Sequence, residues 1–127
     1  MKRKVLVVDD NEDDIELLRR WLAKRGYEHH ALFIAKPSVL GRLEKEVKRI
    51  APDAIVVDGL QGNCYEVIAR VKDVNPKIAS VIFTGDDGIL KSRVPGSVIV
   101  ERQGHRHYVY SKTDYTGLLN FLEKTLC

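Results

Sequence analysis

The fold of this chain is constrained most by short, continuous apolar runs that are rich in β-branched residues and that end at polar side chains. Three such runs lie at residues 5–8, 54–57 and 81–83, and weaker ones at 30–34 and 108–110. Continuous runs of this length are typical of strands buried on both faces of a parallel sheet. Segments with apolar residues at helical spacing separate them. This alternation predicts βαβ units with right-handed crossovers, and therefore an α/β fold with helices on both faces of the sheet.

Length and composition place the chain among ordinary globular domains. Its 127 residues are 44% apolar, so we expect one domain over residues 1–127 with a substantial core. The apolar stretch near the start ends at Asp9, which is too short for a signal peptide, and we expect a cytoplasmic protein. Cys64 and Cys127 are then free thiols. The net charge of +3 comes from mixed acids and bases, which argues against a dedicated nucleic-acid binder.

Residues that are typical of helix ends occur in two segments. Asn11 stands where it can cap the first helix, and Gly26 where it can end that helix. Asn63, followed three residues later by Glu66, matches a capping box and predicts the start of the third helix there.

Polar side chains stand at the carboxyl end of several predicted strands. Asp9 and Asp10 follow the first run, Asp58 follows residues 54–57, Thr84 follows residues 81–83, and Lys112 comes shortly after the last run. The carboxyl ends of parallel strands lie along one edge of the sheet, where ligands of such folds bind. We therefore expect these five side chains to converge on one rim.

Each of these residue types suits phosphoryl transfer. Three crowded carboxylates repel one another unless a hard cation joins them, and oxygen ligands with room for water suit Mg²⁺. Asp58 can act as a nucleophile that forms an acyl phosphate. Lys112 can pair with phosphoryl oxygens, and the Thr84 hydroxyl can hydrogen-bond another of them.

The same residues carry a family resemblance. Residues 5–12, 52–58, 81–85 and 110–112, in this order, resemble the response-regulator receiver domains (CheY-like) of two-component signalling. The resemblance covers nearly the whole chain. It implies a flavodoxin-like, doubly wound sheet with parallel strand order 2-1-3-4-5. It also implies that a histidine kinase or phosphotransfer protein phosphorylates Asp58, and that Mg²⁺ (or Mn²⁺) binds Asp9, Asp10, Asp58 and the Leu60 carbonyl.

The chain departs from the family pattern in places that concern output. The loop at residues 59–63 lacks the usual Met-Pro pair. Lys112 is followed by Thr113 instead of the proline whose cis bond is usual in the family. The position of the switch aromatic, three residues before the lysine, is Val109, with a tyrosine on each side.

The stretch before the last strand is longer than usual and has little helical pattern. Residues 97–101 and 107–111 are both β-rich, and Gly104 between them is a turn signal. We therefore predict a hairpin instead of the family's usual fourth helix, with an added antiparallel edge strand over residues 97–101.

Histidines and arginines gather near this turn. His105 and His107 share one face of the predicted strand, and Arg102 and Arg106 flank the turn. A metal site there lacks a convincing third or fourth ligand. The basic tip is either a solvated turn, which is the default, or a contact for a phosphate or an acidic partner.

Three functions compete. The leading hypothesis is a stand-alone phosphoacceptor that signals by protein contact or phosphorelay and catalyses only its own phosphotransfer and dephosphorylation. The alternative is a receiver-like interaction domain that acts independently of phosphorylation. A metal-dependent phosphohydrolase with an aspartate nucleophile is a poor third, because that family needs Asp-x-Asp-x-Thr and here Asn11 stands two residues after Asp9.

Overall fold

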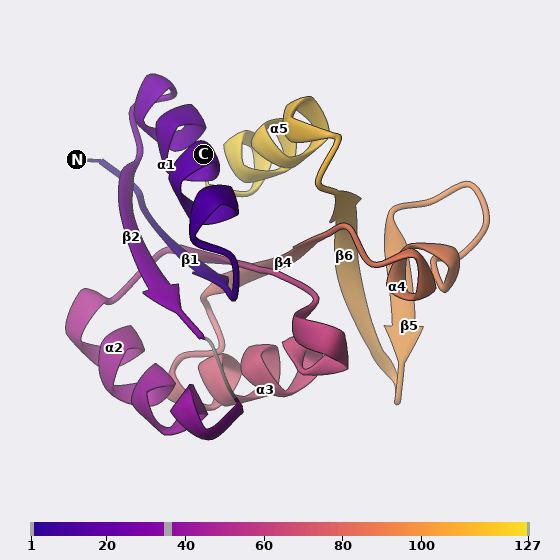
Figure 1. Ribbon diagram of the computed structural model, residues 1–127, viewed down its shortest axis with the longest axis horizontal. Helices are drawn as coiled ribbons and strands as arrows, with labels where there is room; N and C mark the ends of the chain where they lie inside the picture. The colour runs from indigo at the N-terminus through magenta and orange to yellow at the C-terminus, as the bar shows by residue number, and fades with distance from the viewer. Residues whose placement is uncertain (1, 35–36, 127) are drawn as a thin grey trace.

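One six-stranded sheet forms the centre of the molecule. The computed structural model describes residues 2–34 and 37–126. The strands run in the spatial order β2-β1-β3-β4-β6-β5, and all neighbours are parallel except β5 and β6 (Figure 1). The strand bounds are β1 Lys4–Asp9, β2 Glu28–Phe33, β3 Ala54–Val57, β4 Ala79–Thr84, β5 Ile99–Arg102 and β6 His105–Ser111.

Helices cover both faces of this sheet. Helices α1 and α5 lie on one side, and α2 and α3 on the other (Figure 1). The helix bounds are α1 Glu12–Lys24, α2 Leu43–Ile50, α3 Cys64–Val74, α4 Asp87–Lys91 and α5 Tyr115–Leu126, with short 3₁₀ helices at Pro37–Arg42 and Leu60–Gly62. In the described part of the chain, no helix combines the length and apolarity that crossing a membrane requires.

The continuous apolar strands arise because each one serves two cores. In β1, Leu6 and Val8 join the cluster under α2 and α3, whereas Val5 and Val7 join the cluster under α1 and α5. Successive strand residues point to opposite faces, so a strand covered on both sides must be apolar at every position. The predicted α/β architecture is confirmed. Cys64 is a buried free thiol, and Cys127 lies outside the described residues.

The first helix begins and ends as predicted, and the third begins directly after Asn63 as predicted but without the expected cap. The Asn11 side chain accepts hydrogen bonds from the backbone of Asp13 and Asp14, and Gly26 after α1 has φ +83°. The capping box at Asn63 is wrong. Asn63 itself has a helical backbone (φ −74°, ψ −8°) and makes no cap bond. The 3₁₀ turn Leu60–Gly62 leads directly into α3, so Asn63 does not have the extended backbone of a capping residue.

The predicted hairpin is present. Strand β5 pairs antiparallel with β6, from Ile99 opposite Tyr108 to Arg102 opposite His105. Gln103 and Gly104 form the turn, both with positive φ (51° and 80°), as tight two-residue hairpins require.

The added strand also corrects the predicted order 2-1-3-4-5. It takes the fifth place in sequence and the outer edge in space, so the family's last parallel strand is here β6, next to β4. Only one turn of helix, α4, lies between β4 and β5. Strand β5 covers β6, which would otherwise be the open edge of the sheet.

Candidate functional site

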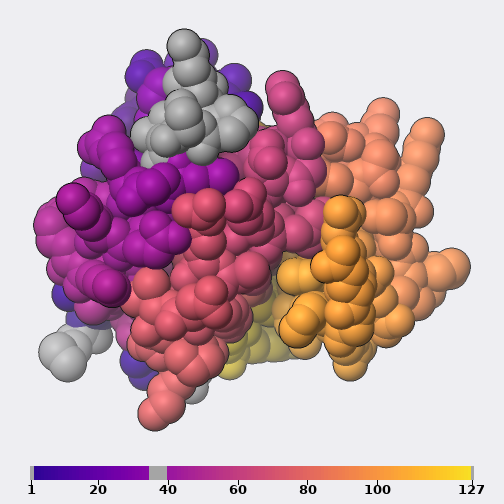
Figure 2. Space-filling view, turned by 90° about the horizontal axis from the view of Figure 1, so that it is seen from below, coloured from indigo at the N-terminus to yellow at the C-terminus, as the bar shows by residue number. Residues whose placement is uncertain are grey.

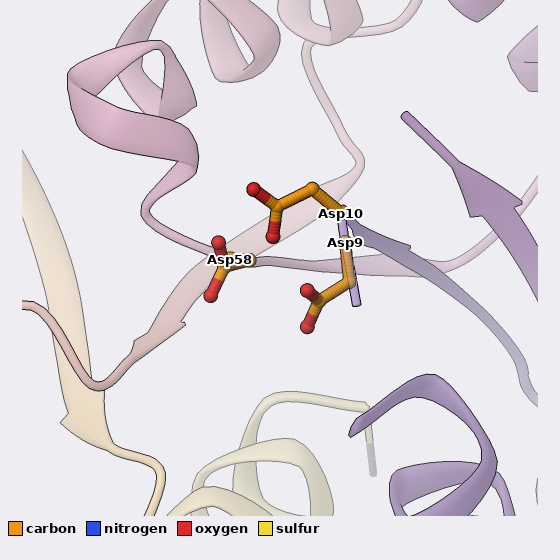
Figure 3. Close-up of side chains that lie close together, drawn as sticks. All are labelled: Asp9, Asp10 and Asp58. Atoms are coloured by element: carbon orange, nitrogen blue, oxygen red, sulfur yellow. The ribbon is translucent and has the colours of Figure 1, made fainter. Parts of the chain in front are cut away.

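The predicted rim exists at the carboxyl ends of the parallel strands. Asp9 ends β1 and Asp58 directly follows β3. One oxygen from each of Asp9, Asp10 and Asp58 lies within 4.8 Å of the other two, and Figure 3 shows the three carboxylates at the ends of these strands. Residues that lie 48 or more positions apart in sequence therefore meet, as the strand-end rule predicts.

Lys112, directly after β6, joins this cluster. Its Nζ donates to Asp9 Oδ2 at 3.0 Å and lies 2.7 Å from Asp58 Oδ1. The lysine side chain is only 20% exposed. Burial alone would lower the pKa of Lys112, but its hydrogen bonds to Asp14 and Asp58 and the nearby negative charge outweigh burial and raise that pKa. The ammonium is therefore a permanent positive charge inside the cluster.

The position of Asp9 in the cluster raises the pKa of its carboxyl group. The residue is 4% exposed. Burial, followed by the charge of Asp58, raises the pKa of Asp9 to about 6, although Lys112 and the Asn11 backbone N–H act in the opposite direction. One lysine does not balance the surrounding carboxylates, so the site favours a further positive charge.

Asp14 is a member of the site that the sequence reasoning missed. Lys112 Nζ donates to Asp14 Oδ2 at 2.6 Å. The first turn of α1 begins directly after the acidic pair and therefore lies over the same rim. That proximity was the available signal, but the rotation of the helix that turns Asp14 toward Lys112 cannot be read from local sequence.

Thr84 is buried beside the loop that follows Asp58. It is 1% exposed, and its hydroxyl oxygen accepts a hydrogen bond from the Asp86 backbone at 2.9 Å. A Cβ atom added at Gly59 would lie 2.6 Å from this oxygen. Glycine is therefore required at position 59 for the loop to pass this close to Thr84.

The loop after Asp58 has an unusual backbone. Leu60 and Gln61 both have positive φ (49° and 55°), a conformation that is costly for side chains with a Cβ. The Leu60 N–H donates to Asp58 Oδ2 at 2.9 Å. The Leu60 carbonyl accepts from both the backbone N–H and the side-chain amide of Asn63. To bind a metal as the resemblance implies, this carbonyl would have to release one of the two donors.

The donor set nevertheless fits a hard divalent cation. Three carboxylates offer oxygen atoms at mutual distances that one ion can span. Asp10 is exposed and Asp58 half-buried, so water can complete the coordination shell, which suits Mg²⁺. Asp9, Asp10 and Asp58 are thus the residues that would hold the ion.

The departures at the last strand have structural counterparts. No cis peptide bond occurs in residues 2–34 and 37–126. The Lys112 backbone instead donates to the Thr84 carbonyl at 3.0 Å, which extends the β4–β6 pairing and places the lysine. Val109 is fully buried against the α2 and α3 side. Tyr108 and Tyr110 point the other way and contact Phe121 of α5.

Comparisons with known proteins show the fold. No family model and no curated protein sequence matches the chain. A response regulator receiver domain protein from Bacillus halodurans superposes with a TM-score of 0.65 at 15% identity, covering 98% of this chain and 97% of that one. The chain thus has a receiver-like fold.

Two further solved structures share the same architecture. A fusion protein that carries a yeast Spc42 trimeric coiled-coil segment matches with a TM-score of 0.70 at 15% identity, over 99% of this chain and 79% of that chain. The cobalamin-dependent S-adenosylmethionine radical enzyme OxsB matches with a TM-score of 0.60 at 15% identity, but only 19% of OxsB is covered. Proteins of different activity share this fold, so function has to be argued from the side chains of the site.

Proposed function

We propose that this chain is a phosphoacceptor of the receiver type, which takes a phosphoryl group on Asp58 from a histidine kinase or phosphotransfer protein in a Mg²⁺-dependent reaction. One observation carries the proposal: Asp58 shares a cluster with Asp9 and Asp10 that fits a divalent cation, and Lys112 Nζ lies 2.7 Å from its Oδ1. A carboxylate flanked by a cation site and a lysine suits phosphoryl transfer, because positioning and charge neutralisation supply most of the catalysis.

The two oxygens of Asp58 have different surroundings. Oδ2 accepts from the Leu60 N–H, whereas Oδ1 faces Lys112. In the proposed step one Asp58 oxygen attacks the phosphorus of a phosphohistidine and forms an acyl phosphate as the N–P bond breaks. The released imidazole nitrogen takes up a proton from solvent. A bound Mg²⁺ would neutralise charge on the transferred group.

Lys112 and Thr84 would then hold the product. Lys112 can pair with a phosphoryl oxygen in place of Asp58 Oδ1, and the Thr84 hydroxyl can donate to another, since its oxygen now accepts from the Asp86 N–H. The chain would act as a cytoplasmic signalling protein that catalyses only its own phosphorylation and dephosphorylation. Its output would pass to a protein partner by contact or by phosphorelay.

Incubation with acetyl phosphate and Mg²⁺, followed by intact-mass spectrometry, tests the proposal. We expect one added phosphoryl group that is labile to base and hydroxylamine, as acyl phosphates are. Asp58→Asn should abolish it, and Asp73→Asn, a change at an exposed aspartate on α3, should not.

Lys112→Ala should still be labelled but should lose the structural response to labelling. If neither acetyl phosphate nor a panel of phosphorylated kinases labels the folded protein, the phosphoacceptor role is wrong. The phosphorylation-independent interaction domain would then take its place.

A further inference from the structure

A second concave site lies away from the acidic rim, between α3 and the β5–β6 hairpin. It has a volume of about 290 Å³. Figure 2 views this side of the molecule, where the hairpin stands beside α3. Ser80, at the start of β4, belongs to its lining, whereas Thr84 of the acidic rim is at the other end of that strand. The residues used below are Tyr65, Lys72, Arg102, His105, Arg106 and His107.

The charges around this pocket are positive and lack acidic partners. Its lining contains two arginines, a lysine and two histidines but no carboxylate. Among the residues that the structure describes, neither Arg102 nor Arg106 forms an ion pair within 4 Å. Glu101 is opposite Arg106 in the strand pairing but is not part of the lining. In contrast, Arg49 of α2 and Arg70 of α3, which do not line the pocket, hydrogen-bond to glutamate side chains.

Arg102 is held in place by aromatic rings. Its guanidinium carbon lies 4.4 Å from the centre of the Tyr65 ring, and the Tyr65 and His107 rings form a T-shaped pair with a centroid distance of 5.0 Å. The hairpin register pairs Arg102 with His105, so both project from the same face as His107. A guanidinium that lies over an aromatic face can still direct N–H groups toward a planar or tetrahedral anion.

Lys72 adds a third cationic side chain to the lining of the pocket. Its Nζ donates to the backbone carbonyls of Ile78 and Pro76. Burial lowers the pKa of Lys72, and burial together with the charges of His105 and Arg102 lowers that of His107. An anionic ligand would relieve this concentration of positive charge.

The pocket also has an apolar part, formed by Ile68 and Ala69 of α3. Its volume is at the small end of the range of about 300–1,000 Å³ that is typical of small-molecule sites. It exceeds the needs of a single inorganic ion, and both of its arginines come from the hairpin side. A ligand that fits must therefore combine an anionic group with a compact organic body.

We propose that this pocket binds a small organic phosphate monoester, with the phosphate at Arg102 and the organic part against α3. A phosphate monoester is favoured over a single carboxylate because its two charges and three terminal oxygens match several converging cations. The inference does not depend on the proposed phosphorylation of Asp58.

Titration of the 127-residue protein, monitored by NMR and calorimetry at constant ionic strength, tests the proposal. The probes are adenosine 5′-monophosphate and ribose 5-phosphate, with adenosine, ribose and inorganic phosphate as comparisons. We expect saturable binding of at least one ester, with shifts confined to the rings of Tyr65, His105 and His107. The unphosphorylated counterpart should not bind, and inorganic phosphate should bind more weakly.

Variants locate the site. Arg102→Gln should weaken ester binding by about tenfold or more, because a charge-assisted bidentate contact is lost. Arg102→Lys should fall between this variant and the wild type, since it keeps the charge but loses the stacked planar group. Arg42→Gln, at an exposed arginine in the Pro37–Arg42 turn, is the matched control and should bind normally. Labelling of Asp58 by acetyl phosphate should be the same in all three variants.

Several results would overturn the assignment. One is unchanged ester affinity in Arg102→Gln, with a wild-type spectrum elsewhere. Another is binding of adenosine that is as tight as binding of adenosine 5′-monophosphate. The third is no saturable binding of any ester up to about 10 mM, a concentration at which even a weak specific site would fill. An acidic peptide that binds this face more tightly than every ester would assign it to a protein partner instead.

Discussion

Replacing Asp9 with asparagine should make the metal-free protein gain stability relative to the wild type as the pH rises. Asp9 is buried beside Asp58, and together these effects raise its pKa from 3.8 to about 6. A carboxylate whose pKa is raised by folding stabilises the protein fully below its unfolded-state pKa, and that stabilisation is lost as the pH rises through the folded-state pKa. Above pH 6 the wild type therefore carries the cost of an ionised Asp9, and Asp9→Asn removes it.

The magnitude follows from the same two pKa values. At 1.36 kcal/mol per pKa unit, ionising Asp9 costs the folded state about 3 kcal/mol more than the unfolded chain at pH 8, and about 1 kcal/mol of that is already present at pH 4.5. In the variant, an asparagine amide faces Lys112 Nζ in place of the Asp9 carboxylate, whose Oδ2 accepts a hydrogen bond from that Nζ. This exchange destabilises the variant by an amount that does not vary with Asp9 ionisation. The free energy of unfolding of the variant relative to wild type should therefore rise by about 2 kcal/mol between pH 4.5 and pH 8.

Urea unfolding in EDTA, followed by the fluorescence of Trp21, measures this difference. Asp73→Asn changes an exposed aspartate on α3 and serves as the control, with an offset from wild type that stays constant between the two pH values. A constant offset for Asp9→Asn would show that Asp9 is not the strained carboxylate of the cluster. A decrease with rising pH would reverse the sign of the whole electrostatic argument.

Three further outcomes are expected. Mg²⁺ at 10 mM should raise the free energy of unfolding at pH 8 by about 1.4 kcal/mol, if the dissociation constant is on the order of 1 mM. Asp10→Asn should lose most of this gain in the same urea titration. Lys112→Met should destabilise the metal-free protein at pH 8 by about 3 kcal/mol, because Asp9 and Asp58 lose their buried counter-charge, and equal stability of variant and wild type would contradict this. Gly104→Ala, at φ +80° in the hairpin turn, should cost about 1 kcal/mol in thermal or urea unfolding.

The sequence was sufficient to predict that the residues at the strand ends lie close together. Asp9, Asp58 and Lys112 stand at the carboxyl ends of apolar runs, and the geometry of a parallel sheet places such ends side by side whatever the intervening helices do. The hairpin was predictable for a similar reason. Two β-rich segments around Gly104 leave few alternatives, and the chain direction of β4 fixes where the second strand returns.

Features that depend on helix orientation and loop backbone were not predictable in this way. The Asp14–Lys112 contact depends on how α1 is rotated over the sheet, which is set by side-chain packing and not by local pattern. Asn63 and Glu66 have the spacing of a capping box, but the chain enters α3 already in a helical conformation. The positive φ of Leu60, a residue that rarely adopts it, has no sequence signal at all.

The position of Lys112 suggests which part of the molecule would respond if Asp58 is phosphorylated as proposed. The hairpin is a poor candidate, because Val109 is buried and the outer edge of β5 is partly closed by the bond from the Val94 N–H to the Ile99 carbonyl. Lys112, in contrast, contacts Asp14 as well as Asp58. A phosphoryl group would compete with Asp14 for the same ammonium, since three acceptor oxygens with nearly two charges attract it more strongly than one carboxylate. Release of Asp14 would loosen the first turn of α1, and this makes α1 and its neighbour α5, not the hairpin, the surface through which the change would reach a partner.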